Sequence, residues 1–407
     1  MQLTRIALAS VFVTLFTGSQ TWAQVGAPSQ LGGANLNTIT TAVPFLMISP
    51  DARSGGMGDV GVAISADANA IHWNAAKLAF AKDNTGLAMN YTPWLRNLVP
   101  DISLSYLSFY KKIDDLQTFG ASLRYFSLGD ITFTSITGEQ IATFRPNELA
   151  LDGVYARKLS DNFSLGIGLR YIYSNLAAGL DQNNQTIPGQ SAAADISGYY
   201  EDKTEVFGKD GKIAFGLSIT NLGAKIAYTE SGNSNFLPTN LRLGTAVTAE
   251  IDDYNSITFA LDLNKLLVPS NPIYARDPLT GQIQFDVNGN PLVAQGEDPN
   301  QKSVLEGVFS SFSDAPSGGI EELREINIAA GMEYWYNNVF ALRSGYFYEH
   351  PTKGGRQYLT FVAGLKYQVF NLNFSYLVPT TRLQGGNPLE NTLRFSMMFD
   401  LAAFSNR

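Results

Sequence analysis

Residues 163–171 read Phe-Ser-Leu-Gly-Ile-Gly-Leu-Arg-Tyr, and every second residue from Phe163 to Tyr171 carries a large apolar side chain. The residues between them are small or polar. A β-strand sends successive side chains to opposite faces of a sheet, so this stretch predicts a strand with one apolar face and one small, polar face. The same alternation recurs from residue 86 onward, for example over 211–220, 255–264 and 391–401.

The number and spacing of such stretches indicate what kind of sheet they build. Alternation alone also fits a soluble sandwich, so the rest of the pattern has to decide. We predict about fourteen strands, an even number, as single-chain outer-membrane barrels require. They cover residues 86–92, 101–111, 117–127, 148–158, 163–174, 194–202, 211–220, 240–251, 255–264, 324–336, 339–348, 357–368, 371–379 and 391–401.

The predicted connections alternate between tight turns and long loops. The turns lie at 111–116, 159–162, 252–254, 337–338 and 369–370, with 203–210 somewhat longer. The long connections lie at 92–100, 128–147, 175–193, 221–239, 265–323, 349–356 and 380–390. Short turns on one side and long loops on the other are typical of transmembrane barrels. The sequence therefore predicts an all-β chain in which residues 86–407 form a transmembrane antiparallel β-barrel with its long loops outside the cell.

The composition suits a wall that faces lipid. Aromatic residues make up 12% of the 407 residues, and charged residues only 16%, against about 25% in typical soluble domains. The net charge of -8 argues against a nucleic-acid partner, because phosphate binding needs a basic surface. With no cysteine, the chain forms neither a disulfide framework nor a thiolate zinc site.

The first residues have the pattern of an export signal. Arg5 is followed by the apolar run Ile6 to Phe16 and then by Thr21-Trp22-Ala23. This predicts a signal peptide over residues 1–23, cleaved after Ala23. The alternative is an N-terminal membrane anchor, which we disfavour because the apolar run is too short to span a bilayer. We expect a multi-pass barrel in the outer membrane with both termini on the periplasmic side.

Residues 24–85 contain no predicted barrel strand, yet they are apolar and rich in glycine. We predict that this segment folds into the barrel lumen, where Gly55, Gly56, Gly58 and Gly61 let its backbone pack against the inner wall. Their spacing is not a nucleotide-binding fingerprint. The loop 265–323 is rich in Asn, Asp, Gly, Pro and Ser, and its length marks it as functional or partly disordered.

Residues able to carry catalysis are few. The two histidines, His72 and His350, fall in the luminal segment and before a proline in a loop. A Ser/His/Asp arrangement on the wall needs strand-borne partners, and neither histidine lies within a predicted strand. The acidic pairs 114–115 and 252–253 occupy predicted turns, which explains them. We predict no catalytic residue, no metal site and no cofactor.

The predicted faces also place arginines and aromatic residues. Arg124, Arg170 and Arg394 fall on inward faces, where we expect them to pair with Asp262, Asp400 or groups of the luminal segment. Aromatic residues at strand ends are expected to form an interface girdle: Tyr91, Trp94, Tyr334, Trp335 and Tyr336.

A family resemblance is carried by the stretch Asp51-Ala52-Arg53-Ser54-Gly55-Gly56-Met57-Gly58-Asp59-Val60-Gly61-Val62-Ala63, with 67–70 and 74–78 after it. It resembles the N-terminal hatch of the FadL-like (OMPP1) barrel superfamily, which often has Asn-Pro-Ala where this chain has Asn74-Ala75-Ala76. Within that superfamily the chain resembles the PorV family, the outer-membrane component of the type IX secretion system of Bacteroidota. The stretches that carry this second resemblance are 44–46, 49–53, 91–95, 123–129, 169–172, 353–358, 376–379 and 391–396.

The resemblance, which runs from about Thr41 to the C-terminus, implies a shuttle rather than a conduit. PorV-like proteins take cargo that bears a C-terminal signal domain from a large SprA/Sov-like translocon barrel. They deliver it to a PorU-like sortase attachment complex with PorQ- and PorZ-like subunits, in contact with outer-membrane lipid. The expected hatch residues are Arg53, Gly55, Gly56, Met57, Gly58, Asp59, His72 and Asn74.

We expect cargo to bind the loops at 92–100, 128–147 and 175–193, with parts of 265–323. The candidate cargo-binding residues are Tyr91, Trp94, Leu95, Arg96, Phe133, Phe144 and Arg145. The alternative is a FadL-like transporter of long-chain fatty acids or other hydrophobic compounds, which needs an apolar pocket under the loops and a lateral opening or hatch movement. A third possibility, a lipopolysaccharide-modifying enzyme, would need a catalytic histidine.

Overall fold

The computed structural model describes residues 37–401, except 97–98, 135–138, 177–185, 230–233, 278–279, 288, 290 and 382–386. The predicted signal peptide and residues 24–36 of the predicted luminal segment lie outside the described residues. No helix in the described part of the chain is long and apolar enough to cross a membrane.

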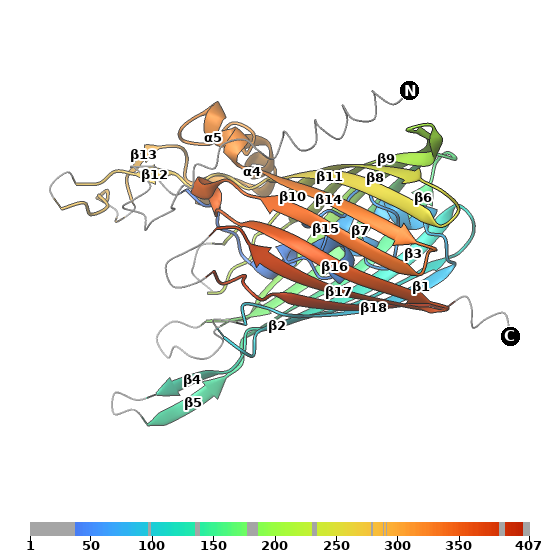
Figure 1. The fold of residues 1–407 in the computed structure, drawn as a ribbon. Helices are drawn as coiled ribbons and strands as arrows, with labels where there is room; N and C mark the ends of the chain where they lie inside the picture. Colours follow the sequence, from blue (N-terminus) through green and yellow to red (C-terminus); the bar gives the residue numbers. More distant parts are fainter. Residues whose placement is uncertain are drawn as a thin grey trace.

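Fourteen antiparallel strands close into one barrel, which confirms the predicted fold class (Figure 1). Consecutive barrel strands pair all the way round, and the barrel closes where β1 pairs with β18. The barrel strands are β1 (Thr85–Pro93), β2 (Ser103–Lys112), β3 (Gln117–Ser127), β6 (Asn147–Lys158), β7 (Phe163–Asn175), β8 (Gly189–Val206), β9 (Lys209–Gly223), β10 (Asn240–Glu250), β11 (Asn255–Leu266), β14 (Ile326–Tyr336), β15 (Phe340–Tyr348), β16 (Gln357–Tyr367), β17 (Phe370–Pro379) and β18 (Leu393–Asp400).

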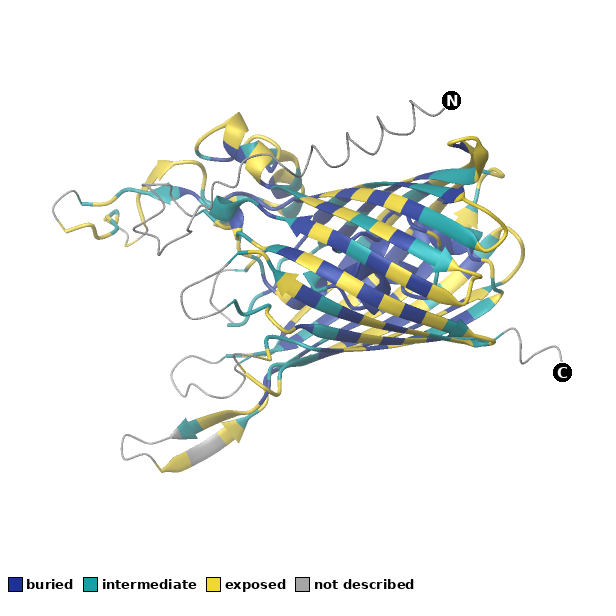
Figure 2. Cartoon of the chain, viewed as in Figure 1, coloured by how far each residue is buried: buried dark blue, intermediate teal, exposed yellow. Residues whose placement is uncertain are grey.

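Side chains of the barrel strands alternate between an outward and an inward face, as the sequence pattern predicts. In β7, Ile167 and Leu169 are 58% and 73% exposed, whereas Gly166 and Arg170 are buried. Figure 2 shows this alternation along the strands as a regular pattern of exposed and buried residues. An apolar outer face against lipid and a small or polar inner face are the arrangement that a transmembrane barrel requires.

The connections alternate as predicted, so the barrel has a tight-turn end and a long-loop end. One prediction about them is wrong: residues 203–210 do not form a longer connection. Instead β8 and β9 are joined by Phe207 and Gly208 alone, with φ of 54° and 74°. Positive φ at both positions is what a two-residue hairpin turn favours. The pattern missed the extra strand length because charged residues replace the apolar alternation there, with Glu205 opposite Asp210.

The long loops contain secondary structure that the pattern did not predict. Between β3 and β6, the strands β4 (Ile131–Thr134) and β5 (Gln140–Phe144) form a separate hairpin that projects from the long-loop end (Figure 1). The other loop elements are β12 (Ile273–Tyr274), β13 (Val293–Gln295), η4 (Pro299–Gln301), α4 (Val304–Ser310), α5 (Gly319–Arg324) and η5 (Pro351–Lys353).

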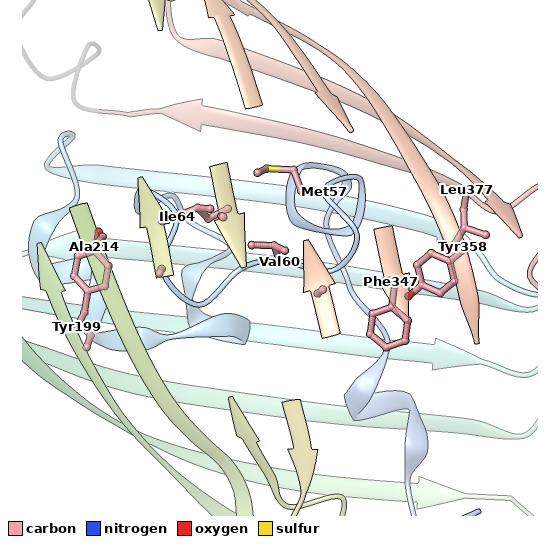
Figure 3. Packing of buried hydrophobic residues seen from close by; sticks show 13 residues of the cluster. Met57, Val60, Ile64, Tyr199, Ala214, Phe347, Tyr358 and Leu377 are labelled. Carbon is pink, nitrogen blue, oxygen red and sulfur yellow. The ribbon is translucent and has the colours of Figure 1, made fainter. Parts of the chain in front are cut away.

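Residues 42–81, which we call the hatch, fold inside the barrel. They form only short helices: η2 (Pro44–Met47), α2 (Ala52–Gly55), α3 (Ala70–Trp73) and η3 (Ala75–Phe80). Three apolar clusters join them to the wall, and Figure 3 shows one of them, where Met57 and Val60 share a cluster with Tyr199 and Phe347. Phe45 packs with Leu104 toward the long-loop end, and Leu78 with Tyr110 toward the tight-turn end. The lumen is therefore a packed core.

The two ends of the described chain lie at opposite ends of the barrel. Asn37 donates its backbone N–H to the Thr352 carbonyl at 3.0 Å, and its side chain bonds Asn271 and Glu321, all at the long-loop end. The last strand, β18, ends at the tight-turn end with Asp400. The hatch therefore enters the lumen from the long-loop end. The predicted periplasmic position of the two chain termini concerns residues outside the described range, and it stays a prediction.

Candidate functional site at the hatch and the long-loop end

Helix α2 carries the principal ion pair between the hatch and the wall. Asp51 caps the helix by accepting the backbone N–H of Ser54 at 2.8 Å. The helix directs Arg53 toward Glu333 of β14, where its Nε and Nη2 each lie 2.9 Å from a carboxylate oxygen. Its Nη1 lies 2.9 Å from Asp67 of the hatch. Bidentate pairing of this kind is strong and fixes the orientation of both groups.

A second arginine approaches the same carboxylate from the wall. Nε of Arg343 in β15 lies 2.5 Å from Oε2 of Glu333, and Arg53, Glu333 and Arg343 are all buried. Glu333 therefore balances two guanidinium groups inside the barrel. Because buried charges are stable only when they are paired, this triad holds the hatch in position.

Inward-facing glycines of the wall make room for the hatch backbone. A Cβ atom at Gly345 would lie 2.0 Å from the carbonyl carbon of Met57, and one at Gly331 would lie 2.6 Å from the Met57 oxygen. In the hatch, Gly58 has a φ of 73° and donates its N–H to Oγ1 of Thr360 at 2.9 Å. Glycine within a strand often marks such a close backbone approach.

Two of the inward arginines contact the hatch, which was one of the three kinds of partner predicted for them. Arg124 donates to the Leu46 carbonyl at 2.8 Å, and its Nη2 lies 2.6 Å from Nδ1 of His72. Arg394 donates to the Gly55 carbonyl at 3.3 Å. Both arginines are buried. Because buried polar groups need hydrogen-bond partners within the protein, the hatch carbonyls take the place of water.

The predicted pairing of these arginines with Asp262 is wrong. Asp262 instead accepts the N–H groups of Gly61 and the next hatch residue, at 2.7 and 2.9 Å. Arg170 pairs with Asp152 and Asp195 of the neighbouring strands, at 2.5 and 3.0 Å. The other predicted partner, Asp400, is the last residue of β18, far along the strand from Arg394.

The two histidines have structural contacts. His72 in α3 bonds Arg124, and His350 caps η5 by accepting the Thr352 N–H at 3.2 Å. Among the residues described, no group of three or more His, Cys, Asp or Glu side chains is placed to hold a metal ion. The absence of catalysis stays a prediction.

A small hollow, which we call the mouth pocket, lies between the hatch and the wall at the long-loop end. Its volume is about 50 Å³, whereas ligand pockets usually enclose about 300–1,000 Å³. In it, Nη2 of Arg394 lies 3.9 Å from Asp59, whose other oxygen accepts the Tyr358 hydroxyl at 2.5 Å. The space fits a small polar group rather than an acyl chain. It is lined by Pro44, Met47, Ile48, Ser49, Asp59, Trp94, Arg356, Tyr358, Leu377, Leu389 and Arg394.

A larger hollow of about 650 Å³ lies on the outside of the wall, across β15 to β18 and β1. It is bordered by outward side chains such as Met89, Phe340, Phe374 and Phe395, around the small residue Ala363. Because these side chains face lipid, the hollow belongs to the membrane contact and not to a luminal binding site.

The hairpin formed by β4 and β5 is fixed at its base by an ion pair. Nε and Nη2 of Arg145 lie 2.6 and 2.8 Å from the two carboxylate oxygens of Asp130. The hydrogen bonds from Arg145 lower the pKa of Asp130 below its usual value, and the same pairing raises the pKa of Arg145. Asp101 accepts the Asp130 N–H at 2.8 Å, which ties this base to the loop between β1 and β2.

The structure separates the candidate cargo-binding residues into three places. Phe133, Phe144 and Arg145 lie on or beside the hairpin. Trp94 lines the mouth pocket, and Leu95 and Arg96 follow it in the loop between β1 and β2. Tyr91 does not belong with them, because it lies within β1 on the outward face and borders the outer hollow. Its position fits the predicted interface girdle.

The predicted hatch residues lie together inside the barrel, and all except Asp59 are buried. The wall residues that hold them were not predicted, chiefly Glu333, Arg343 and Gly345. The sequence does mark these positions. On the inward faces of the predicted strands, Glu333 and Arg343 are charged residues and Gly345 is a glycine. The contact between Glu333 and Arg53 could not be predicted from the pattern, because the two residues lie 280 positions apart in the sequence.

A closed barrel with an apolar outer face and a filled lumen defines an outer-membrane β-barrel protein. The family model described as "Type IX secretion system protein PorV" matches residues 32–273, more than half of the chain, and the chain belongs to that family. No curated protein matches the sequence.

Solved structures similar to this chain include three barrels. The Pseudomonas putida toluene transporter TodX is 12% identical, with a TM-score of 0.43, over 89% of this chain and 98% of that one. The Ralstonia pickettii toluene transporter TbuX is 13% identical, with a TM-score of 0.45, over 90% and 98%. A Pseudomonas aeruginosa FadL homologue is 12% identical, with a TM-score of 0.43, over 89% and 99%.

Proposed function

We propose that this protein is an outer-membrane shuttle of the type IX secretion system. It binds the C-terminal signal domain of secreted cargo that leaves a SprA/Sov-like translocon barrel, and it passes the cargo to a PorU-like sortase complex with PorQ- and PorZ-like subunits. Its long-loop end faces outside the cell, and β18 ends on the periplasmic side. It performs no catalysis itself. Membership of the PorV family supports the role in type IX secretion.

The filled lumen is the observation that carries the proposal. Three apolar clusters join the hatch to the wall and together reach both ends of the barrel, and Arg53 of the hatch is paired with Glu333 of the wall. A polypeptide has no path through the barrel while the hatch is seated. Cargo therefore binds to an outer surface of the protein. The tight-turn end offers little surface for this contact, and the long loops supply most of it.

The hairpin of β4 and β5 is the part of that surface best suited to cargo. In the described part of the chain, β4 and β5 pair only with each other, so each leaves one edge open. Edge strands accept a further strand through main-chain hydrogen bonds, which suits a receptor for many cargo sequences. A two-stranded hairpin is only marginally stable alone, so an added strand would also stabilise it.

The test replaces residues 131–144 with Asn-Gly, which keeps Asp130 and Arg145. We expect the barrel to fold normally, as judged by its heat-dependent mobility in gels. Affinity for a purified cargo signal domain should fall at least about tenfold, which corresponds to about 1.4 kcal/mol. The double substitution Phe133→Ala/Phe144→Ala should lower the affinity less. Phe207→Ala, which alters an exposed phenylalanine at the tight-turn end, should leave the affinity unchanged. Unchanged affinity in the shortened variant would exclude the hairpin as the cargo site.

Purification of the tagged protein from native outer membrane separates the shuttle from its alternative. Recovery of a very large barrel, a sortase-like subunit and secreted proteins with a shared C-terminal domain would support the shuttle. A lone barrel that carries fatty acids or other hydrophobic compounds would favour a FadL-like transporter. Preserved lipopolysaccharide in a strain with both His72 and His350 replaced would exclude the third possibility, an enzyme.

A further inference from the structure

The loop between β11 and β14 carries apolar side chains where water would be expected. Leu305 and Phe309 on α4 are 61% and 73% exposed, and Ile320 and Leu323 on α5 are 70% and 69% exposed. Phe312, just after α4, is 51% exposed. Scattered exposed leucines are ordinary, but two neighbouring helices that each present a large apolar face are not.

The charged side of α5 faces the barrel, which is the reverse of a water-exposed helix. Glu321 and Glu325 are buried, and both accept hydrogen bonds from Lys353 of η5, at 2.6 and 2.9 Å. Lys265, at the end of β11, lies 2.6 Å from Glu325 and 3.0 Å from Glu322. We call these five residues the rim clamp. The three acidic side chains point inward, whereas Ile320 and Leu323 point outward beside the exposed Arg324. A long arginine side chain can lie along an apolar surface while its charge stays at the headgroups, so this face suits surroundings less polar than water.

The position of the helices indicates what that is. Figure 1 shows α4 and α5 beside the long-loop end of the barrel, outside its outline and next to β11. Leu263 of β11 and Ile328 of β14 are register partners at that end of the outward face, and both are exposed. Leu323 precedes Ile328 by only five residues. The apolar faces therefore continue the lipid-facing surface of the barrel beyond its last strand residues.

We propose that α4 and α5 form a membrane foot: their apolar faces lie in the leaflet at the long-loop end, and the rim clamp holds them there. Amphipathic helices bury such faces at the boundary between headgroups and acyl chains. The ligand is lipid, recognised through its acyl chains. The membrane foot would fix the orientation of the long loops relative to the membrane.

The chain lacks cysteine, so single spin labels can report where each residue lies. Phe309→Cys and Leu323→Cys would be labelled in the full chain, reconstituted in phosphatidylcholine/phosphatidylglycerol vesicles. Two positions calibrate the result: Leu169→Cys on the lipid-facing wall, 73% exposed, and Val287→Cys at a loop position, 100% exposed. The readout compares collisions with oxygen, which concentrates in lipid, and with a water-soluble nickel complex.

We expect the foot labels to resemble the wall label, with nickel accessibility at least about fivefold below that of the Val287→Cys label. Accessibility equal to that of the loop label would overturn the proposal, since the faces would then lie in water. Shielding from both reagents would also overturn it, because a protein surface, from a second copy or from this chain, would then cover them. Lys353→Met tests the clamp: the foot labels should lose their lipid signature while the Leu169→Cys label keeps it.

Discussion

Gly345→Ala is expected to lower the free energy of unfolding by about 3 kcal/mol and to loosen the hatch. The added Cβ would lie 2.0 Å from the Met57 carbonyl carbon and 2.3 Å from the Gly58 nitrogen. Both atoms are backbone, so no side-chain rotation relieves the clash. Overpacking in well-packed cores typically costs about 1–3 kcal/mol, and this contact lies at the severe end. Denaturant unfolding in detergent, followed by the gel mobility of the folded barrel, measures it.

A second wall glycine provides a control of opposite sign. Gly153 in β6 faces outward, and a Cβ there would meet nothing within 4 Å. Because glycine weakens a strand interior relative to alanine by roughly 0.5–1 kcal/mol, Gly153→Ala should leave stability unchanged or raise it slightly. Labelling of a cysteine at Ser54, buried in α2, reports the hatch directly. Its rate should rise in Gly345→Ala and not in Gly153→Ala. Equal behaviour of the two variants would mean that the hatch does not rest on β15.

The barrel was predictable because lipid imposes one rule on every strand. The expected strand at 163–174 and the observed β7 at Phe163–Asn175 differ by one residue, since outward apolar side chains mark each position in turn. The rule holds only along the membrane-spanning part of the strands. The extension of β8 to Val206, the hairpin of β4 and β5, and helices α4 and α5 all lie beyond that part, and all were missed.

The hatch contacts were beyond prediction for a different reason. The segment was expected in the lumen, but short helices such as α2 and α3 give no periodic pattern from which a face can be read. Which wall residue meets Arg53 depends on how these turns orient the chain inside a closed barrel. The clamp shows the same limit: Glu321 and Glu325 would be expected to face water, and they turn inward only because Lys265 and Lys353 arrive from two other segments.

Glu333→Ala is expected to destabilise the protein by about 3–5 kcal/mol, because it leaves Arg53 and Arg343 buried without their shared carboxylate. The matched control is Arg145→Ala. Its partner Asp130 lies 2.6 Å away, and the two side chains are exposed, at 63% and 43%. Surface ion pairs contribute little to stability, so this variant should unfold almost as the parent does.

A double-mutant cycle compares the stability of Arg53→Ala, Glu333→Ala and the double variant Arg53→Ala/Glu333→Ala. It distinguishes an ion pair from simple packing. If the two groups act through each other, the double variant loses less than the sum of the single variants, with a coupling of at least about 2 kcal/mol. Additive losses would show that Arg53 and Glu333 stabilise the barrel independently. In that case the hatch would be held by its apolar clusters alone, around Met57 and Leu78. Coupled losses, together with faster labelling of a cysteine at Ser54 in these variants, would show that the triad holds the hatch in the lumen.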